Sequence, residues 1–262
     1  MVFAAAGVVS CTKESAPKET VIAPPVFPPA QNPSFVEEFD NVGDLVSKGW
    51  VLRNNSNPIG TTGWRQGRYE PATTAQYKFL GPTPFVGFPA YSANTSPNDF
   101  ISCDVTAVSD ATWLGGIYSA WLISPKVPIS NGDQLVFWTR AVDDSYYPVY
   151  TKDRMQVYVN YTDGTANVGA SATSLGSFTT KVLDINQDYI YNDPSGNTPA
   201  VAGYPRDWTK YTITFNNVPG GTAQNARFAF RYHGTDAGLS GGPAGANFPT
   251  VVGIDSLAFI KK

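Results

Sequence analysis

Acidic residues at the two ends of the folded part of this chain could bind a cation. One end reads Glu-Glu-Phe-Asp-Asn, with Glu37, Glu38 and Asp40, and the other reads Gly-Ile-Asp-Ser-Leu, with Asp255. Carboxylate oxygens are the ligands that Ca²⁺ prefers. If the first and last strands are neighbours, these side chains converge, so we predict a structural Ca²⁺ bound by Glu37, Asp40 and Asp255, with Glu38 as an alternative to Glu37.

Asp255 lies in a strand pattern that is apolar on both sides, and we expect Leu257 and Phe259 to share its side. A buried carboxylate is unfavourable unless it is paired or hydrogen-bonded. Calcium would satisfy it. An ion pair with Arg140 or Arg231, or hydrogen bonds from backbone amides, would satisfy it as well, and the sequence leaves these alternatives open.

Two motifs imitate reactive or metal sites but lack the necessary context. Gly-Leu-Ser-Gly-Gly, around Ser240, matches the nucleophile motif of serine hydrolases, yet no strand and helix flank it and the only histidine, His233, precedes it. Asp-Ile-Asn-Gln-Asp at 184–188 opens like a calcium loop but lacks the glycine and the final glutamate. We therefore predict that the protein is not an enzyme.

Aromatic residues suggest a binding surface. Tyr146, Tyr147 and Tyr150 are closely spaced in a polar loop, and exposed aromatic rings stack on sugars and anchor protein interfaces. We predict that these three tyrosines bind a ligand. Most tryptophans fall within apolar strand patterns and are expected in the core, namely Trp64, Trp113, Trp121, Trp138 and Trp208.

Composition favours strands over helices. Of 262 residues, 15% are charged, while glycine and proline number 24 and 21. Apolar residues alternate with polar ones in segments such as 134–141 and 209–215, which predicts an all-β protein built as an antiparallel β-sandwich, a jelly roll. The net charge of -3 provides no positive field for nucleic acid, so we predict no nucleic-acid partner.

The N-terminal segment resembles a processed export signal. The apolar run at 2–9 is too short to cross a bilayer, and the following Val-Val-Ser-Cys resembles a bacterial lipobox. We predict that Cys11 is acylated and that this lipid is the protein's only contact with the membrane. Cys103 is then expected to be a buried free thiol.

The chain divides into three predicted parts. Residues 1–10 are the remnant of a lipoprotein signal peptide, and 11–33 hold the lipidated cysteine and a proline-rich tether. Residues 34–262 form the jelly-roll domain.

Several strand motifs occur in a familiar order: FVEEFDN, AWLISPKVPISNGDQLVFWTRA, DRMQVYVN and VGIDSLAFI. Together they resemble choice-of-anchor J domains, relatives of cleaved-adhesin and MAM-like jelly rolls, over about residues 35–260. The resemblance implies a β-sandwich displayed outside the cytoplasm, often on bacterial surface proteins. It also supports the calcium prediction, because many related jelly rolls hold a structural Ca²⁺.

These observations predict a non-catalytic lipoprotein of the outer membrane, periplasmic or surface-exposed, whose domain binds glycans or proteins. The alternative is a structural envelope component with a protein partner. A polysaccharide hydrolase is the least favoured reading.

Overall fold

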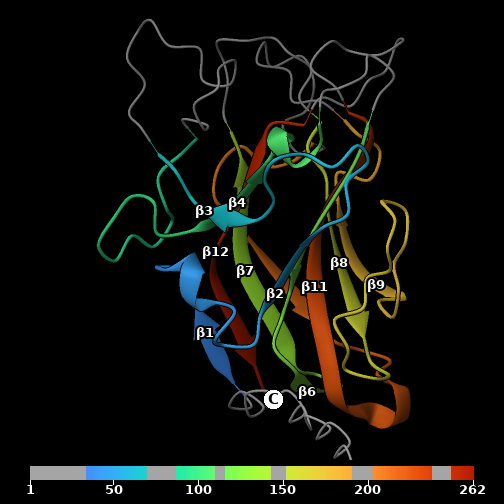
Figure 1. Ribbon diagram of the computed structural model, residues 1–262. Helices are drawn as coiled ribbons and strands as arrows, with labels where there is room; N and C mark the ends of the chain where they lie inside the picture. The colour runs from blue at the N-terminus through green and yellow to red at the C-terminus, as the bar shows by residue number, and fades with distance from the viewer. Residues whose placement is uncertain (1–33, 70–86, 110–115, 143–151, 191–202, 238–248) are drawn as a thin grey trace, which may run out of the picture.

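The protein is a sandwich of two antiparallel β-sheets (Figure 1). The computed structural model describes residues 34–69, 87–109, 116–142, 152–190, 203–237 and 249–262. Within these ranges no helix is long and apolar enough to span a membrane. The predicted all-β class is confirmed.

Among the described residues, each sheet contains six strands. In sheet A the order is β10 (Thr209–Thr214), β7 (Gln134–Ala141), β12 (Val251–Ile260), β4 (Ile101–Asp104) and β3 (Arg65–Gln66), and β1 (Phe35–Glu37) also pairs with β12. In sheet B it is β2 (Val51–Asn54), β5 (Gly116–Ile123), β11 (Thr222–Ala237), β8 (Met155–Asn160) and β9 (Thr180–Ile185), and β6 (Val127–Ser130) also pairs with β11. The described chain also contains the short 3₁₀ helices η1 (Val42–Asp44), η2 (Val105–Ala107) and η3 (Pro219–Gly221).

The strand order is that of a jelly roll. Numbering β4, β5 and β7 to β12 from one to eight, sheet A contains 1-8-3-6 and sheet B contains 2-7-4-5. The first and last strands are neighbours as expected, since Val36 of β1 pairs with Ala258 of β12. The predicted jelly roll is thus confirmed.

The main core lies between the sheets, where alternating residues point inward. Phe137 of sheet A meets Phe230 of sheet B edge to face, with ring centroids 4.9 Å apart. Cys103, with a free thiol, and Trp64 are buried in this layer, as predicted, and Trp121 is buried on the outer face of sheet B. Burying each large apolar side chain contributes roughly 1.5–3 kcal/mol, so this layer supplies most of the folding free energy.

A smaller apolar cluster lies on the outer face of each sheet. On sheet B it gathers Trp121, Tyr158 and Phe178, and on sheet A it joins Phe88 and Phe100 to Val251, with Trp208 packed against them. The sheet A cluster exists because the segment at 87–100 folds back over part of that sheet.

A β-bulge in β12 changes which side chains face the core. The register against β7 shifts between Asp255 and Ala258, and Ser256 adopts a left-handed φ of 45°. Leu257 lies in the main core, whereas Asp255 faces outward toward the segment at 87–100. The expectation that Asp255 and Leu257 share one side is therefore wrong, because the inserted residue reverses the alternation.

The end of β12 is fastened to the turn between β6 and β7. Lys261 Nζ lies 2.6 Å from Asp133 Oδ2, and the amides of Lys262 and Ser130 donate to the same carboxylate at 3.1 and 2.7 Å. Burial alone would raise the pKa of Asp133, but these donors hold it below its usual value. The ionised carboxylate therefore stabilises the fold.

We expect Asp133→Ala to lower the free energy of unfolding by roughly 2 kcal/mol at pH 7, because three donors lose a buried acceptor. Urea unfolding measures this. The loss should shrink below about pH 4, where the depressed pKa no longer favours the native state. Asp207→Ala, at a side chain that is 96% exposed, is the control and should change stability little. Equal effects of the two substitutions would contradict a stabilising role for the hydrogen bonds to Asp133.

Candidate functional site

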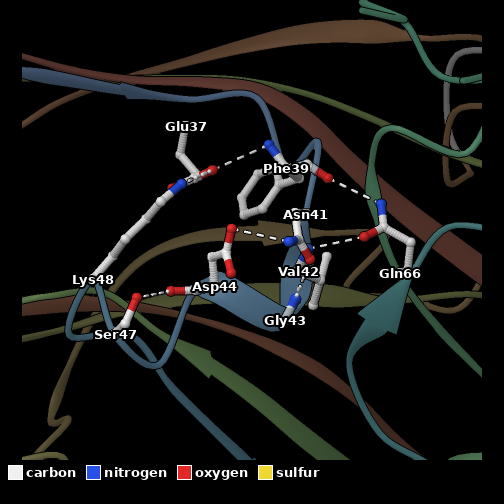
Figure 2. A network of polar contacts seen from close by, with 9 residues as sticks. All are labelled: Glu37, Phe39, Asn41, Val42, Gly43, Asp44, Ser47, Lys48 and Gln66. Atoms are coloured by element: carbon white, nitrogen blue, oxygen red, sulfur yellow. Dashed lines mark hydrogen bonds and ion pairs between the residues drawn. The ribbon is translucent and has the colours of Figure 1, made fainter. Parts of the chain in front are cut away.

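Glu37 holds the segment that follows β1. It has the inward parity of Phe35, and Lys48 Nζ donates to its two oxygens at 3.1 and 2.9 Å (Figure 2). The amide of Phe39 donates to Oε1 at 3.2 Å. Gln66 fixes the same segment from β3, accepting from the amide of Val42 at 2.8 Å and donating to the carbonyl of Phe39 at 3.0 Å.

Asp255 is fully buried and bound by backbone amides. The amides of Tyr91 and Ser92 donate to Oδ2 at 2.8 and 3.0 Å, and the amide of Ser256 donates to Oδ1 at 2.7 Å. Of the three alternatives that the sequence leaves open, hydrogen bonds from amides are what the structure contains. Asp255 thereby ties the segment at 87–100, which we call the covering segment, to β12.

The two arginines considered as partners of Asp255 bind elsewhere. Arg140 lies 3.9 Å from Asp207 and over the ring of Phe88. Arg231 belongs to sheet B, where it donates to Ser119 Oγ at 3.0 Å and to Gln156 Oε1 at 3.3 Å.

The environment of Asp255 disfavours its charge. Burial raises the pKa of Asp255 to about 7, although the three amides oppose this rise, and the nearby charge of Glu38 raises it further. Asp255 therefore changes protonation state near neutral pH.

The three predicted calcium ligands do not form one group. Glu37 and Asp255 project from opposite faces of sheet A, and Asp40 is exposed, accepting from Asn94 Nδ2 at 3.2 Å. Glu38, not Glu37, is the glutamate that lies close to Asp255, since it accepts a hydrogen bond from Oγ of the neighbouring Ser256 at 2.7 Å. No three His, Cys, Asp or Glu residues in the described ranges form a group that could hold a metal. These residues do not fit the predicted site, and calcium binding itself stays a prediction.

Several other predicted positions lie outside the described residues. These are the predicted ligand-binding residues Tyr146, Tyr147 and Tyr150, and also Cys11, Ser240 and Trp113. His233 is described, and its Nδ1 lies 2.9 Å from the carbonyl of Tyr118. Burial lowers the pKa of His233 to about 4, with a further contribution from Arg231, so the ring is neutral.

An aromatic surface on sheet A was not predicted. The ring of Tyr91 lies parallel to that of Trp138, with centroids 3.9 Å apart and planes at 18°, and Tyr91 is 44% exposed. Trp208 lies 6.4 Å from Tyr91 at 63°. We call Tyr91, Trp138 and Trp208 the aromatic platform. The expectation that both tryptophans are core residues is wrong, since each is partly exposed outside the main core.

Sheet register and Asp255 position the platform. Trp138 pairs with Asp255 on one side and with the exposed Lys210 on the other, so the three form one row across β12, β7 and β10. Asp255 binds the backbone of Tyr91, while Trp208 Nε1 donates to the carbonyl of Pro89 at 2.9 Å. The covering segment is thus held at two points, which fixes the exposed ring.

The alternation in β7 indicates that Trp138 faces away from the core, because Leu135 and Phe137 face inward. This signal could have found one member of the platform. Tyr91 lies in a segment without periodicity, so no comparable signal marks it.

Comparisons with known proteins describe the fold alone. No family model and no curated protein matches the sequence. The K1 cleaved adhesin domain of Lys-gingipain from Porphyromonas gingivalis W83 is 18% identical with a TM-score of 0.48, and the match covers 87% of this chain and 98% of that one. The K2 cleaved adhesin domain of Lys-gingipain is 15% identical with a TM-score of 0.46 over the same shares.

A carbohydrate-binding module, TmCBM61, solved with β-1,4-galactotriose, is 9% identical with a TM-score of 0.38. That match covers 86% of this chain and 99% of that one. At these identities and TM-scores, the similarity carries no assignment of function to this chain.

We expect Asp255 to make the protein less stable as pH rises. Its raised pKa means that the native state binds its proton more tightly than the unfolded state, so this contribution is complete below about pH 4 and is lost through pH 7. Asp255→Asn carries no titrating proton. The free energy of unfolding of the wild type, measured in EDTA, should therefore fall by roughly 2 kcal/mol more than that of the variant between pH 5 and 8.

Asp153, whose pKa burial raises to about 6, is common to both proteins, so its effect cancels when the pH dependence of the variant is subtracted from that of the wild type.

The same variant tests calcium binding. If added Ca²⁺ raises the melting temperature of the wild type but not of Asp255→Asn, calcium binds beside Asp255. If EDTA and Ca²⁺ leave the wild type unchanged, the calcium prediction is wrong.

Proposed function

We propose that this protein binds carbohydrate, without catalysis, through the aromatic platform. One observation carries the proposal: the ring of Tyr91 is held flat on Trp138 and remains 44% exposed. Exposing a large apolar ring is unfavourable unless a ligand covers it, and a preformed position lowers the entropic cost of binding.

The surroundings of the platform suit a sugar, which has apolar C–H faces and hydroxyl groups at its edges. Tyr91, supported by Trp138, offers a flat apolar surface, and Lys210 and Asp207, both exposed, lie on β10 or just before it. These charged groups can hydrogen-bond to hydroxyls at the edge of a stacked ring.

Three buried titratable groups of the described chain support a non-catalytic role, because each is hydrogen-bonded within the fold. Asp153 accepts hydrogen bonds from the amide of Thr250 at 2.8 Å and from Tyr232 Oη. Asp255 binds amides, and His233 is neutral against a carbonyl.

We expect Tyr91→Ala to weaken binding to any glycan recognised on an array by tenfold or more, which corresponds to about 1.4 kcal/mol. The substitution removes the ring but retains the backbone amide of residue 91, so the hydrogen bond from this amide to Asp255 stays in place. Isothermal titration with the array hit measures the loss.

Tyr91→Phe is the matched control and should bind nearly as well as the wild type. Wild-type affinity in Tyr91→Ala, at an unchanged melting temperature, would refute the platform as the binding site. Capture of an envelope protein without affinity for any glycan would instead select the second candidate function, a structural envelope component, because aromatic rings also anchor protein interfaces.

We propose further that acylation of Cys11 anchors the protein to the outer membrane, as the lipobox-like sequence suggests. Cys11→Ser should move the protein from the membrane fraction to the soluble fraction of a bacterial host that processes lipoproteins. Cys103→Ala, at the only other cysteine, is the control and should stay with the membrane. Membrane association of Cys11→Ser would contradict the anchor.

A further inference from the structure

Below the platform, the outer face of sheet A continues as two rows of apolar and uncharged polar side chains. One row crosses four strands through Val36 of β1, Ala258 of β12, Val136 of β7 and Thr212 of β10. The next row pairs Ile260 with Gln134, and Gln134 with Thr214. We call these seven residues the strip. Figure 1 shows β1, β12 and β7 side by side.

The strip is exposed to an unusual degree for apolar side chains. Val36 is 62% exposed and Ile260 is 43% exposed. The described chain has five large exposed hydrophobic residues, and three of them, Val36, Ile260 and Tyr91, lie on this one face. Such clustering marks an interaction surface rather than the scattered exposure that any protein shows.

The strip contains no charged side chain. Its nearest charges stand at its borders: Lys210 beside Trp138 in the row above, Glu38 just after β1, and Lys262, whose side chain lies over Gly132 beyond Gln134. An anionic partner would find no cation within the strip to replace its lost hydration, so the surface favours an uncharged ligand.

The strip and the platform are continuous. Along β7, Gln134, Val136 and Trp138 point to the same outer face, and these positions span about 14 Å at the rise of a β-strand. Tyr91 extends this line over Trp138. A single sugar ring on the platform leaves most of this surface uncovered.

We infer that the ligand is an extended, uncharged polysaccharide chain that lies across both the platform and the strip. This inference rests on the proposed carbohydrate binding and adds the substrate class. The rings of the chain stack on Tyr91, and its apolar faces cover Val36, Ala258 and Ile260.

Affinity electrophoresis in gels containing mannan, xylan, β-glucan or galactan tests the inference, with alginate and heparin as anionic polymers. Titrations then compare the disaccharide and the hexasaccharide of the polymer that binds. We expect the hexasaccharide to bind at least tenfold more tightly than the disaccharide, and the anionic polymers to bind more weakly than the neutral one.

The double variant Val36→Glu, Ile260→Glu should weaken hexasaccharide binding at least tenfold and leave disaccharide binding unchanged. Val36→Thr, Ile260→Thr is the milder version should the charges affect folding. Ile59→Glu, at a residue that is 64% exposed and bridges to Val108, is the control outside the strip.

The two proposals fail separately. Wild-type hexasaccharide affinity in the strip variants, equal affinity for both lengths, or tighter binding of alginate or heparin would overturn the extended neutral chain and leave carbohydrate binding in place. A dimer in sedimentation that the strip variants abolish would assign the strip to a second copy of the protein. Failure of every saccharide to bind would overturn the proposed function itself.

Discussion

One buried carboxylate joins two parts of this molecule. Asp255 accepts amide hydrogen bonds from Tyr91 and Ser92 in the covering segment and from Ser256 in its own strand. Without it, the donors of the covering segment would be buried and unsatisfied beneath the ring of Tyr91. The position of the aromatic platform therefore follows from a polar contact that lies entirely below it.

A second buried carboxylate connects the two sheets. Asp153, just before β8, binds Thr250, just before β12, and Tyr232 in β11. It thereby joins sheet A to sheet B at the end of the sandwich where these strands begin or finish. Both carboxylates have a raised pKa because burial outweighs their donors, so the sandwich combines an apolar interior with two buried acidic groups whose contribution to the folding free energy falls as pH rises.

The sandwich itself could be predicted because apolar residues at alternate positions of a strand indicate which side of that strand is buried. Leu135 and Phe137, or Phe228 and Phe230, repeat at every second residue and must face one core. The neighbouring first and last strands followed from the jelly-roll pattern. The bulge could not be predicted, since a left-handed Ser256 leaves no signal in hydrophobic spacing, and the faces of Glu37 and Asp255 depend on it. Tyr91 was missed because its place depends on hydrogen bonds to a residue 164 positions away.

The pairing of β1 with β12 has a mechanical consequence. The described chain enters the domain at Ser34, and β1 holds to the sheet through only three residue pairs, beginning with Phe35 and Phe259. A pulling force applied before Ser34 and directed away from the sheet would load these pairs one after another. Detachment of β1 would remove Val36 from the outer face while the eight jelly-roll strands stay paired, so tension along the chain would reshape this surface before it unfolds the domain.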